Sequence, residues 1–160
     1  MQGNALMHSH GPVAGRLAGK VAMVTGAGGG QGRAAALLFA QAGAQVMASE
    51  LIASSCAETL AIASERGLAI EMSEVDAADE AQVAKWVDAV VKRHGGVDIL
   101  YNNAAHTHFA SFADMTLHQW RETLRLELDP VFIPSKAAWP HLIARGGGSI
   151  VNIASVSGMQ

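Results

Sequence analysis

The stretch that decides the fold of this chain reads Thr25-Gly26-Ala27-Gly28-Gly29-Gly30-Gln31-Gly32. The apolar run before it, residues 20–24, predicts a buried strand, and the Ala- and Leu-rich run after it, residues 33–42, predicts a helix. Glycines let the backbone approach a pyrophosphate, and the unpaired N–H groups of a helix N-terminus attract its charge. The pattern therefore favours a nucleotide cofactor, although a glycine-rich turn by itself is also typical of a simple tight connection.

An acidic residue further along the chain supports the nucleotide. Glu50 closes the next apolar run, residues 45–49, and lies about 20 positions beyond the glycines, where a dinucleotide-binding fold places the carboxylate that holds the adenosine ribose. The alternative is that Glu50 is only a solvated strand end.

Composition narrows the class of protein. The 160 residues are 50% hydrophobic and 16% charged, with a net charge of −3, which indicates a folded globular chain. We expect no nucleic-acid partner, because the sequence has no Lys/Arg cluster. We expect no membrane partner, because no apolar run approaches the roughly 20 residues of a spanning helix. The single cysteine, Cys56, excludes an internal disulfide and suits a cytoplasmic location.

The rest of the chain alternates strand and helix patterns. Further strands are predicted over residues 68–75, 97–101 and 149–153. Strands that alternate with helices predict parallel strands joined by right-handed crossovers. The predicted fold class is therefore α/β, a Rossmann-like doubly wound parallel sheet with five strands. We expect residues 1–18 to form a flexible N-terminal arm and residues 19–160 to form one dinucleotide-binding domain.

Helix signals mark the segments between these strands. Ser55 and Glu58 match a capping box for a helix to about residue 66, and Asp79 is placed to cap the next helix. That second helix is predicted to turn one apolar face toward the core, made of Val83, Trp86, Val87, Val90 and Val91.

A longer helical segment precedes the fifth strand. Thr116 and Gln119 form a second capping-box pattern, and an apolar face follows at Leu117, Trp120 and Leu124. Three prolines then interrupt the pattern. Because proline removes a helical hydrogen bond, we expect one helix to about residue 128, a kink or break, and a second helical piece.

Four motifs, each on its expected element, carry a family resemblance. The glycine stretch fits the pattern Thr-Gly-x-x-x-Gly-x-Gly, and Asp76 follows the third strand, where the family has an adenine-contacting aspartate. Asn102-Asn103-Ala104-Ala105 fits the family's Asn-Asn-Ala-Gly segment. Ile150-Val151-Asn152-Ile153-Ala154-Ser155 fits the strand that delivers a catalytic serine. From about residue 17 to residue 160, the chain resembles the N-terminal part of the short-chain dehydrogenase/reductase family.

This resemblance implies hydride transfer between a nicotinamide ring and the carbon of a small alcohol or ketone substrate. Ser155 is then the catalytic residue that holds the substrate oxygen. The residues implied at the cofactor are Gly26, Gly28, Gly30, Gln31, Gly32, Glu50, Asp76, Asn102 and Ala104. Relatives of this kind also imply a homo-oligomer for a full-length protein.

The chain departs from the family pattern in several places. The family's Tyr-x-x-x-Lys motif belongs shortly after Ser155, but the only tyrosine is Tyr101, which is predicted to pack in the core. We therefore expect the first part of a longer protein or a truncated product, with the C-terminal part of the fold missing. Glu127 takes the place of the family's water-holding asparagine, and Ala105 that of a glycine. The alternative function is a catalytically inactive nucleotide-binding fragment or pseudoenzyme.

The expected cofactor is NAD and not NADP. A carboxylate at position 50 accepts hydrogen bonds from free ribose hydroxyls and repels a 2′-phosphate. Gly29 and Leu51 stand where NADP-using relatives have a basic residue. We expect no metal site, because His106 and His108 lack the further ligands that zinc requires.

Overall fold

A parallel five-stranded sheet forms the centre of the molecule. The computed structural model describes residues 15–155. The strands are β1 (Val21–Thr25), β2 (Gln45–Glu50), β3 (Ile70–Glu74), β4 (Ile99–Asn102) and β5 (Ser149–Asn152). Their order in the sheet is β3-β2-β1-β4-β5, so the direction of progression reverses at β1. This order confirms the predicted doubly wound α/β class and opens a crevice at the carboxyl ends of β1 and β4.

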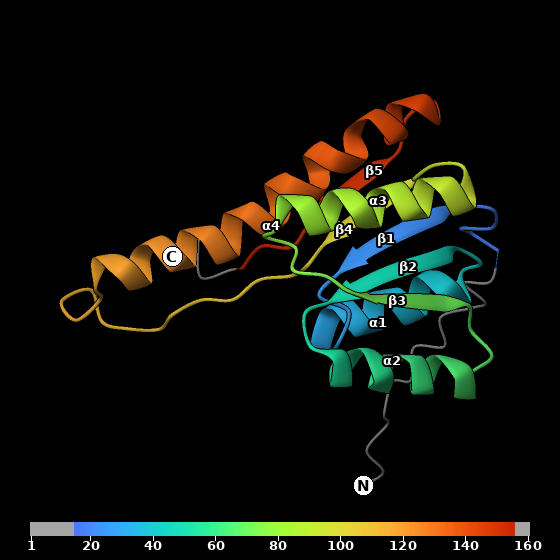
Figure 1. The fold of residues 1–160 in the computed structure, drawn as a ribbon. Coiled ribbons are helices and arrows are strands. Elements are labelled where there is room, and N and C mark those ends of the chain that lie inside the picture. Colours follow the sequence, from blue (N-terminus) through green and yellow to red (C-terminus); the bar gives the residue numbers. More distant parts are fainter. Residues whose placement is uncertain (1–14, 156–160) are drawn as a thin grey trace, which may run out of the picture.

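Two helices cover each face of the sheet (Figure 1). Helices α1 (Gly30–Gln41) and α2 (Ala53–Glu65) lie on one face, and α3 (Glu80–His94) and α4 (Leu117–Ala144) lie on the other. Alternate residues of β1 point to opposite faces: Met23 joins the core under α3 and α4, whereas Val24 joins the core under α1 and α2. Because both faces are covered, all five residues of β1 are buried.

The helix signals around α2 and α3 had different outcomes. Asp79 caps α3 as predicted, since its side chain accepts hydrogen bonds from two backbone N–H groups, and the predicted apolar face of α3 is buried or partly buried. The predicted capping box of Ser55 and Glu58 is wrong. Helix α2 begins at Ala53, so its N-cap is Ile52 and not Ser55, and no side chain caps it. The Glu50 carboxylate accepts the N–H groups of Leu51 and Ile52 instead.

The prediction was a kink or break after residue 128, and the break is wrong, because α4 is one continuous helix over Leu117–Ala144. Pro130 and Pro134 lie inside it and are buried on its inner face, in line with Ala138 and Leu142. Pro130 has no N–H, which leaves the carbonyl of Leu126 without its helical donor. The backbone N–H of His106 donates to that carbonyl at 3.3 Å. A loop residue thus replaces the missing helical hydrogen bond.

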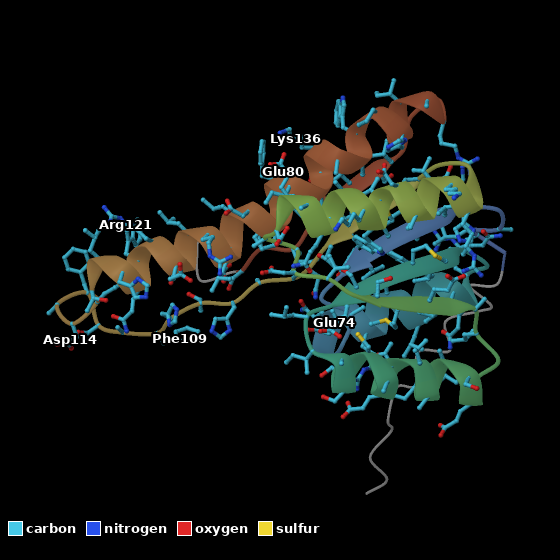
Figure 2. The ribbon with its side chains drawn as sticks, in the orientation of Figure 1. Glu74, Glu80, Phe109, Asp114, Arg121 and Lys136 are labelled. Atoms are coloured by element: carbon cyan, nitrogen blue, oxygen red, sulfur yellow. The ribbon has the colours of Figure 1, made fainter. Side chains whose placement is uncertain are left out.

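The N-terminal half of α4 projects beyond the sheet. Figure 2 shows Arg121 on this half, with Phe109 and Asp114 on the connecting loop beside it. The predicted capping box of Thr116 and Gln119 is present. The predicted apolar face is not buried within residues 15–155, since Leu117 and Trp120 are 61% and 50% exposed.

The chain before β1 packs against the sheet where it is described. Most of the predicted arm, residues 1–14, lies outside the described residues. At its end, the Leu17 N–H donates to the Ala42 carbonyl at 2.8 Å, and Leu17 packs against the core under α1 and α2. Across residues 15–155, no helix combines the length and the hydropathy that a bilayer span requires.

Candidate active site at the carboxyl edge of the sheet

Close backbone approaches surround the glycine turn between β1 and α1. Gly26 has a φ of +66°, and a Cβ there would lie 2.8 Å from Ala104 Cα. A Cβ on Gly28 would lie 2.5 Å from Glu50 Cγ, and one on Gly32 would collide with the carbonyl of Gly26. These three positions require glycine, because any larger residue would push neighbouring backbone or side chains out of place. Gly30, at a φ of +49°, faces open space.

The carboxylate of Glu50 is fixed against this turn. Its Oε2 accepts the N–H of Gly28 at 3.0 Å. Its Oε1 accepts the N–H of Leu51 at 2.8 Å and that of Ile52 at 3.3 Å. Both oxygens thus have backbone donors, so the negative charge is held at the glycine turn and not directed away from it.

The turn after β4 is locked beside the glycine turn. The buried Thr25 hydroxyl accepts the N–H groups of Asn103 at 3.0 Å and Ala104 at 3.1 Å. The Asn103 side-chain amide donates to the Gly26 carbonyl at 3.0 Å. The sequence interpretation did not single out Thr25 or Asn103 for these contacts. The sequence did contain a signal for these contacts, because a hydroxyl ends β1 and an amide follows β4, two strands that pair in parallel.

Asn102 has a different environment from its neighbour. Its side chain is 1% exposed, and Nδ2 donates to Ser135 Oγ and to Asn152 Oδ1, both at 2.9 Å. The amide therefore joins β4, β5 and α4. The structure brings Ala104, and not the amide of Asn102, to the glycine turn.

A cavity of about 480 Å³ opens where the strand order reverses. Glu50, Asp76 and Ala104, three of the residues predicted at the cofactor, contribute to its wall. The Asp76 carboxylate accepts the N–H of Ala78 at 2.8 Å. The wall also contains Gly26, Leu51, Ile52, Val75, Ala77, Asn103, Ala105, His106, Leu126 and Pro130. Elements far apart in sequence thus enclose one hollow with two carboxylates.

Gln31 and Ser155, also predicted as site residues, do not line this cavity. Gln31 is exposed on the first turn of α1 and, with Asn152 and Ala154, borders a neighbouring hollow. Ser155 is exposed three residues beyond β5, at the same carboxyl edge of the sheet but outside the wall of the cavity.

Three residues that invite a chemical interpretation take part in contacts between rings. The Tyr101 ring meets the Phe39 ring edge to face, with centroids 5.7 Å apart. The rings of His106 and His108 meet in the same way at 5.7 Å. Among residues 15–155, no group of three or more His, Cys, Asp or Glu side chains is arranged to hold a metal ion.

Comparison with known proteins decides the family. The model of the short-chain dehydrogenase family matches residues 20–160. The chain belongs to the short-chain dehydrogenase family. The chain is 40% identical over 144 residues to an uncharacterised oxidoreductase of Thermotoga maritima, a match that covers 90% of this chain and 56% of the relative.

Other short-chain dehydrogenases show the same partial coverage. A D-threitol dehydrogenase of Mycolicibacterium smegmatis is 40% identical, with 88% of this chain and 54% of the relative covered. A crystallised 7α-hydroxysteroid dehydrogenase, in complex with NADH and 7-oxo glycochenodeoxycholic acid, matches with a TM-score of 0.85 at 31% identity. That match covers 92% of this chain and 58% of the other. The present chain therefore spans somewhat more than half the length of these relatives.

The residues at the carboxyl edge fit the adenosine and pyrophosphate end of a dinucleotide. Side chains at Gly26, Gly28 and Gly32 would fill the glycine turn, and α1 begins within this stretch, at Gly30. Glu50 and Asp76 supply hydrogen-bond acceptors at the wall of the same cavity. These are the backbone donors and carboxylates that such a ligand requires.

Proposed function

We propose that this chain provides the cofactor-binding part of an NAD-dependent oxidoreductase that acts on a small alcohol or ketone. The observation that carries the proposal is the position of Glu50, whose Oε2 lies 3.0 Å from the Gly28 nitrogen. A carboxylate there accepts hydrogen bonds from the 2′- and 3′-hydroxyls of NAD. It also repels the 2′-phosphate of NADP.

Each predicted residue has a defined task in this proposal. The glycine turn holds the pyrophosphate on backbone N–H groups at the start of α1, Glu50 holds the adenosine ribose, and Asp76 contacts the adenine. Ser155 donates a hydrogen bond to the substrate oxygen and so stabilises the charge that develops on it. NAD, when bound, supplies the hydride acceptor. Ala104 lies where the turn after β4 approaches that cofactor, and Asn102, the last residue of β4, joins that strand to β5 and α4.

Two relatives support this choice. The structural neighbour at a TM-score of 0.85 is complexed with NADH, and a relative at 40% identity is a D-threitol dehydrogenase. The first title names a nicotinamide cofactor, and the second name gives a hydroxyl-bearing substrate. Within the same proposal we place the protein in the cytoplasm and expect a full-length form to be a homo-oligomer.

A second candidate function is nucleotide binding without turnover. Tyr101, the only tyrosine of the chain, packs against Phe39, and Glu127 stands where the family has an asparagine. A phenol in that position does not supply the proton exchange that the family performs with tyrosine and lysine. Binding and turnover therefore need separate measurements.

The test of the cofactor is a calorimetric titration of the chain with NAD⁺ and with NADP⁺. We expect NAD⁺ to bind at least tenfold more tightly than NADP⁺. Glu50→Gln should weaken NAD⁺ binding by about tenfold, since a hydrogen bond to a charged acceptor contributes about 1.5–3 kcal/mol.

Glu74→Gln is the matched control, because Glu74 ends the neighbouring strand β3 and pairs in register with Glu50. Glu74 is exposed and does not line the cavity, so this variant should bind NAD⁺ like the unaltered chain. Equal losses in both variants, or no NAD⁺ binding at all, would contradict the proposal. Alcohol-dependent NADH absorbance then separates turnover from binding, and binding without absorbance change favours the second candidate.

A further inference from the structure

Arg33 is held against the outer side of the glycine turn. Its Nε donates to Thr59 Oγ1 at 2.9 Å, and its Nη2 donates to the Gly28 carbonyl. The same Nη2 pairs with Glu58 Oε2 at 2.8 Å. One guanidinium therefore connects α1, the glycine turn and α2.

Gly28 lies between two opposite charges. Glu50 accepts its N–H on one side, and Arg33 donates to its carbonyl on the other. Only Gly28 therefore separates the Arg33 guanidinium from the carboxylate of Glu50, the proposed ribose ligand. At that distance a charge still acts strongly on a phosphate group placed beside Glu50.

Thr59 sets the direction of the guanidinium. Its side chain is fully buried, and its hydroxyl donates to the Ala27 carbonyl at 2.9 Å while accepting from Arg33. The Arg33 side chain is 22% exposed. A buried partner on Nε and a backbone carbonyl on Nη2 hold the head group in one orientation, so Arg33 stays at this end of the site.

Glu58 is the solvent-facing partner of this cation. Its side chain is 66% exposed, which is typical of an ion pair that adds little to folding. Its charge nevertheless acts on the site, because it offsets the charge of Arg33 at the edge where the ribose is expected. Two carboxylates, Glu50 and Glu58, thus lie near the single cation of Arg33, so the net charge of these three side chains is negative.

We propose that Glu58 is a second specificity-determining carboxylate, which neutralises Arg33 and so keeps it from holding a 2′-phosphate. The inference rests on the proposed NAD site and extends it from Glu50 to a residue on α2. Removing the Glu58 charge leaves Arg33 in place, clamped by Thr59 and Gly28, with its positive charge no longer offset. The site then tolerates a phosphate better, while contacts to a free 2′-hydroxyl are unchanged.

The experiment compares Kd values for NAD⁺ and NADP⁺ in Glu58→Gln and in a charge-matched control. The control is Glu65→Gln, since Glu65 is exposed at the end of the same helix and its loss changes the net charge equally. Glu58→Gln should bind NADP⁺ more tightly and raise the ratio of NADP⁺ to NAD⁺ affinity about fivefold. Glu65→Gln should change neither value.

A second comparison identifies Arg33 as the cause. In an Arg33→Met background, Glu58→Gln should no longer improve the ratio of NADP⁺ to NAD⁺ affinity, even where both nucleotides bind more weakly. Adding Glu50→Gln to Glu58→Gln should raise that ratio beyond either single variant. High salt should reduce the gain.

The outcomes separate this inference from the proposed function. NAD⁺ binding together with the same NADP⁺ response in Glu58→Gln and Glu65→Gln overturns the role of Glu58 and leaves the NAD site standing. A gain that persists in the Arg33→Met background also overturns it. A chain that binds neither nucleotide overturns the proposed function and this inference with it.

Discussion

Helices α3 and α4 cover the same face of the sheet but bury their apolar residues differently. In α3 the residues Val83, Trp86, Val87 and Val90 follow one helical face, and all are buried. In α4 the buried residues recur every fourth position, while larger apolar side chains are half or more exposed: Trp120, Leu128, Phe132 and Trp139. The described part of the molecule therefore covers the apolar face of α3, whereas it leaves much of the apolar surface of α4 exposed.

The two helices meet where α4 crosses the sheet. Figure 2 shows Lys136 of α4 beside Glu80 of α3, and the Nζ to Oε1 distance is 3.1 Å. Both side chains are more than half exposed, so this pair contributes little to stability. The contact depends instead on Ala138 and Leu142, which join the α3 core. Changes in α3 and in the C-terminal half of α4 should therefore matter more than changes in the projecting half.

The largest expected effect comes from matched tryptophan substitutions. Trp86→Ala in α3 should lower the free energy of unfolding by about 3–5 kcal/mol, because it opens a cavity in the core. Trp120→Ala in the projecting half of α4 should change it by less than about 0.5 kcal/mol. Urea denaturation followed by circular dichroism measures both. Equal losses of free energy of unfolding in the two variants would contradict the difference between the helices. If Trp86→Ala does not fold, Trp86→Phe takes its place in the comparison.

The next effect concerns how the end of α4 is anchored. Asp98 Oδ2 accepts the Val21 N–H at 2.9 Å and the Arg145 guanidinium at 2.8 Å. Burial raises the pKa of Asp98, but these hydrogen bonds outweigh it and hold the pKa below its usual range. Asp98→Asn should cost about 2 kcal/mol at neutral pH, since the buried Val21 N–H and the partly exposed Arg145 guanidinium lose a charged acceptor.

The sign of the pH dependence follows from the lowered pKa of Asp98. The stabilisation is complete above the ordinary aspartate pKa of about 3.9 and is lost as the pH falls through the lower folded value. In urea titrations at a series of pH values, Asp98→Asn should lose less free energy of unfolding on acidification than the unaltered chain. Asp88→Asn, at an exposed position of α3, should leave it unchanged. If the free energy of unfolding of Asp98→Asn falls with pH as steeply as that of the unaltered chain, the pairing of Asp98 with Arg145 does not contribute to stability in acid.

The smallest effect is at Pro130 and tests how the loop after β4 is attached. Pro130→Ala restores a helical donor to the Leu126 carbonyl, which then competes with the His106 N–H. Hydrogen exchange at His106 should accelerate by up to about tenfold, because one backbone hydrogen bond contributes about 1 kcal/mol. Pro140→Ala, an exposed position of the same helix, should leave exchange at His106 unchanged. Equal exchange in both variants would mean that the Leu126 carbonyl does not hold the loop.

Local patterns in the sequence predicted much of the sheet and part of the site. The doubly wound parallel sheet could be inferred because apolar runs alternate with amphipathic ones, and Asp79 marked the start of α3. Glu50 was identified from its spacing to the glycines, and the structure places its carboxylate at the turn. Its role in cofactor binding, like that of Asp76 and Ser155, stays a prediction until the titrations are done.

Long-range contacts account for what the sequence did not predict. The effect of proline on an isolated helix predicted a kink or break in α4, but the helix is unbroken and its Leu126 carbonyl accepts a hydrogen bond from His106. Glu58 resembled a capping residue, yet it pairs with Arg33, which lies 25 positions earlier in the chain. Neither contact has a signal within a few residues of the positions involved.

The sequence by itself determined the alternation of strands and helices, the glycine turn and the acidic residue that ends β2, because spacing, propensity and capping act over short stretches of chain. Only the tertiary structure decided which way the side chain of Asn102 points, that α4 runs unbroken through its prolines, and that Arg33 is shared between Gly28, Thr59 and Glu58. Those features depend on hydrogen bonds between segments that meet only once the sheet has formed, and no local pattern encodes them.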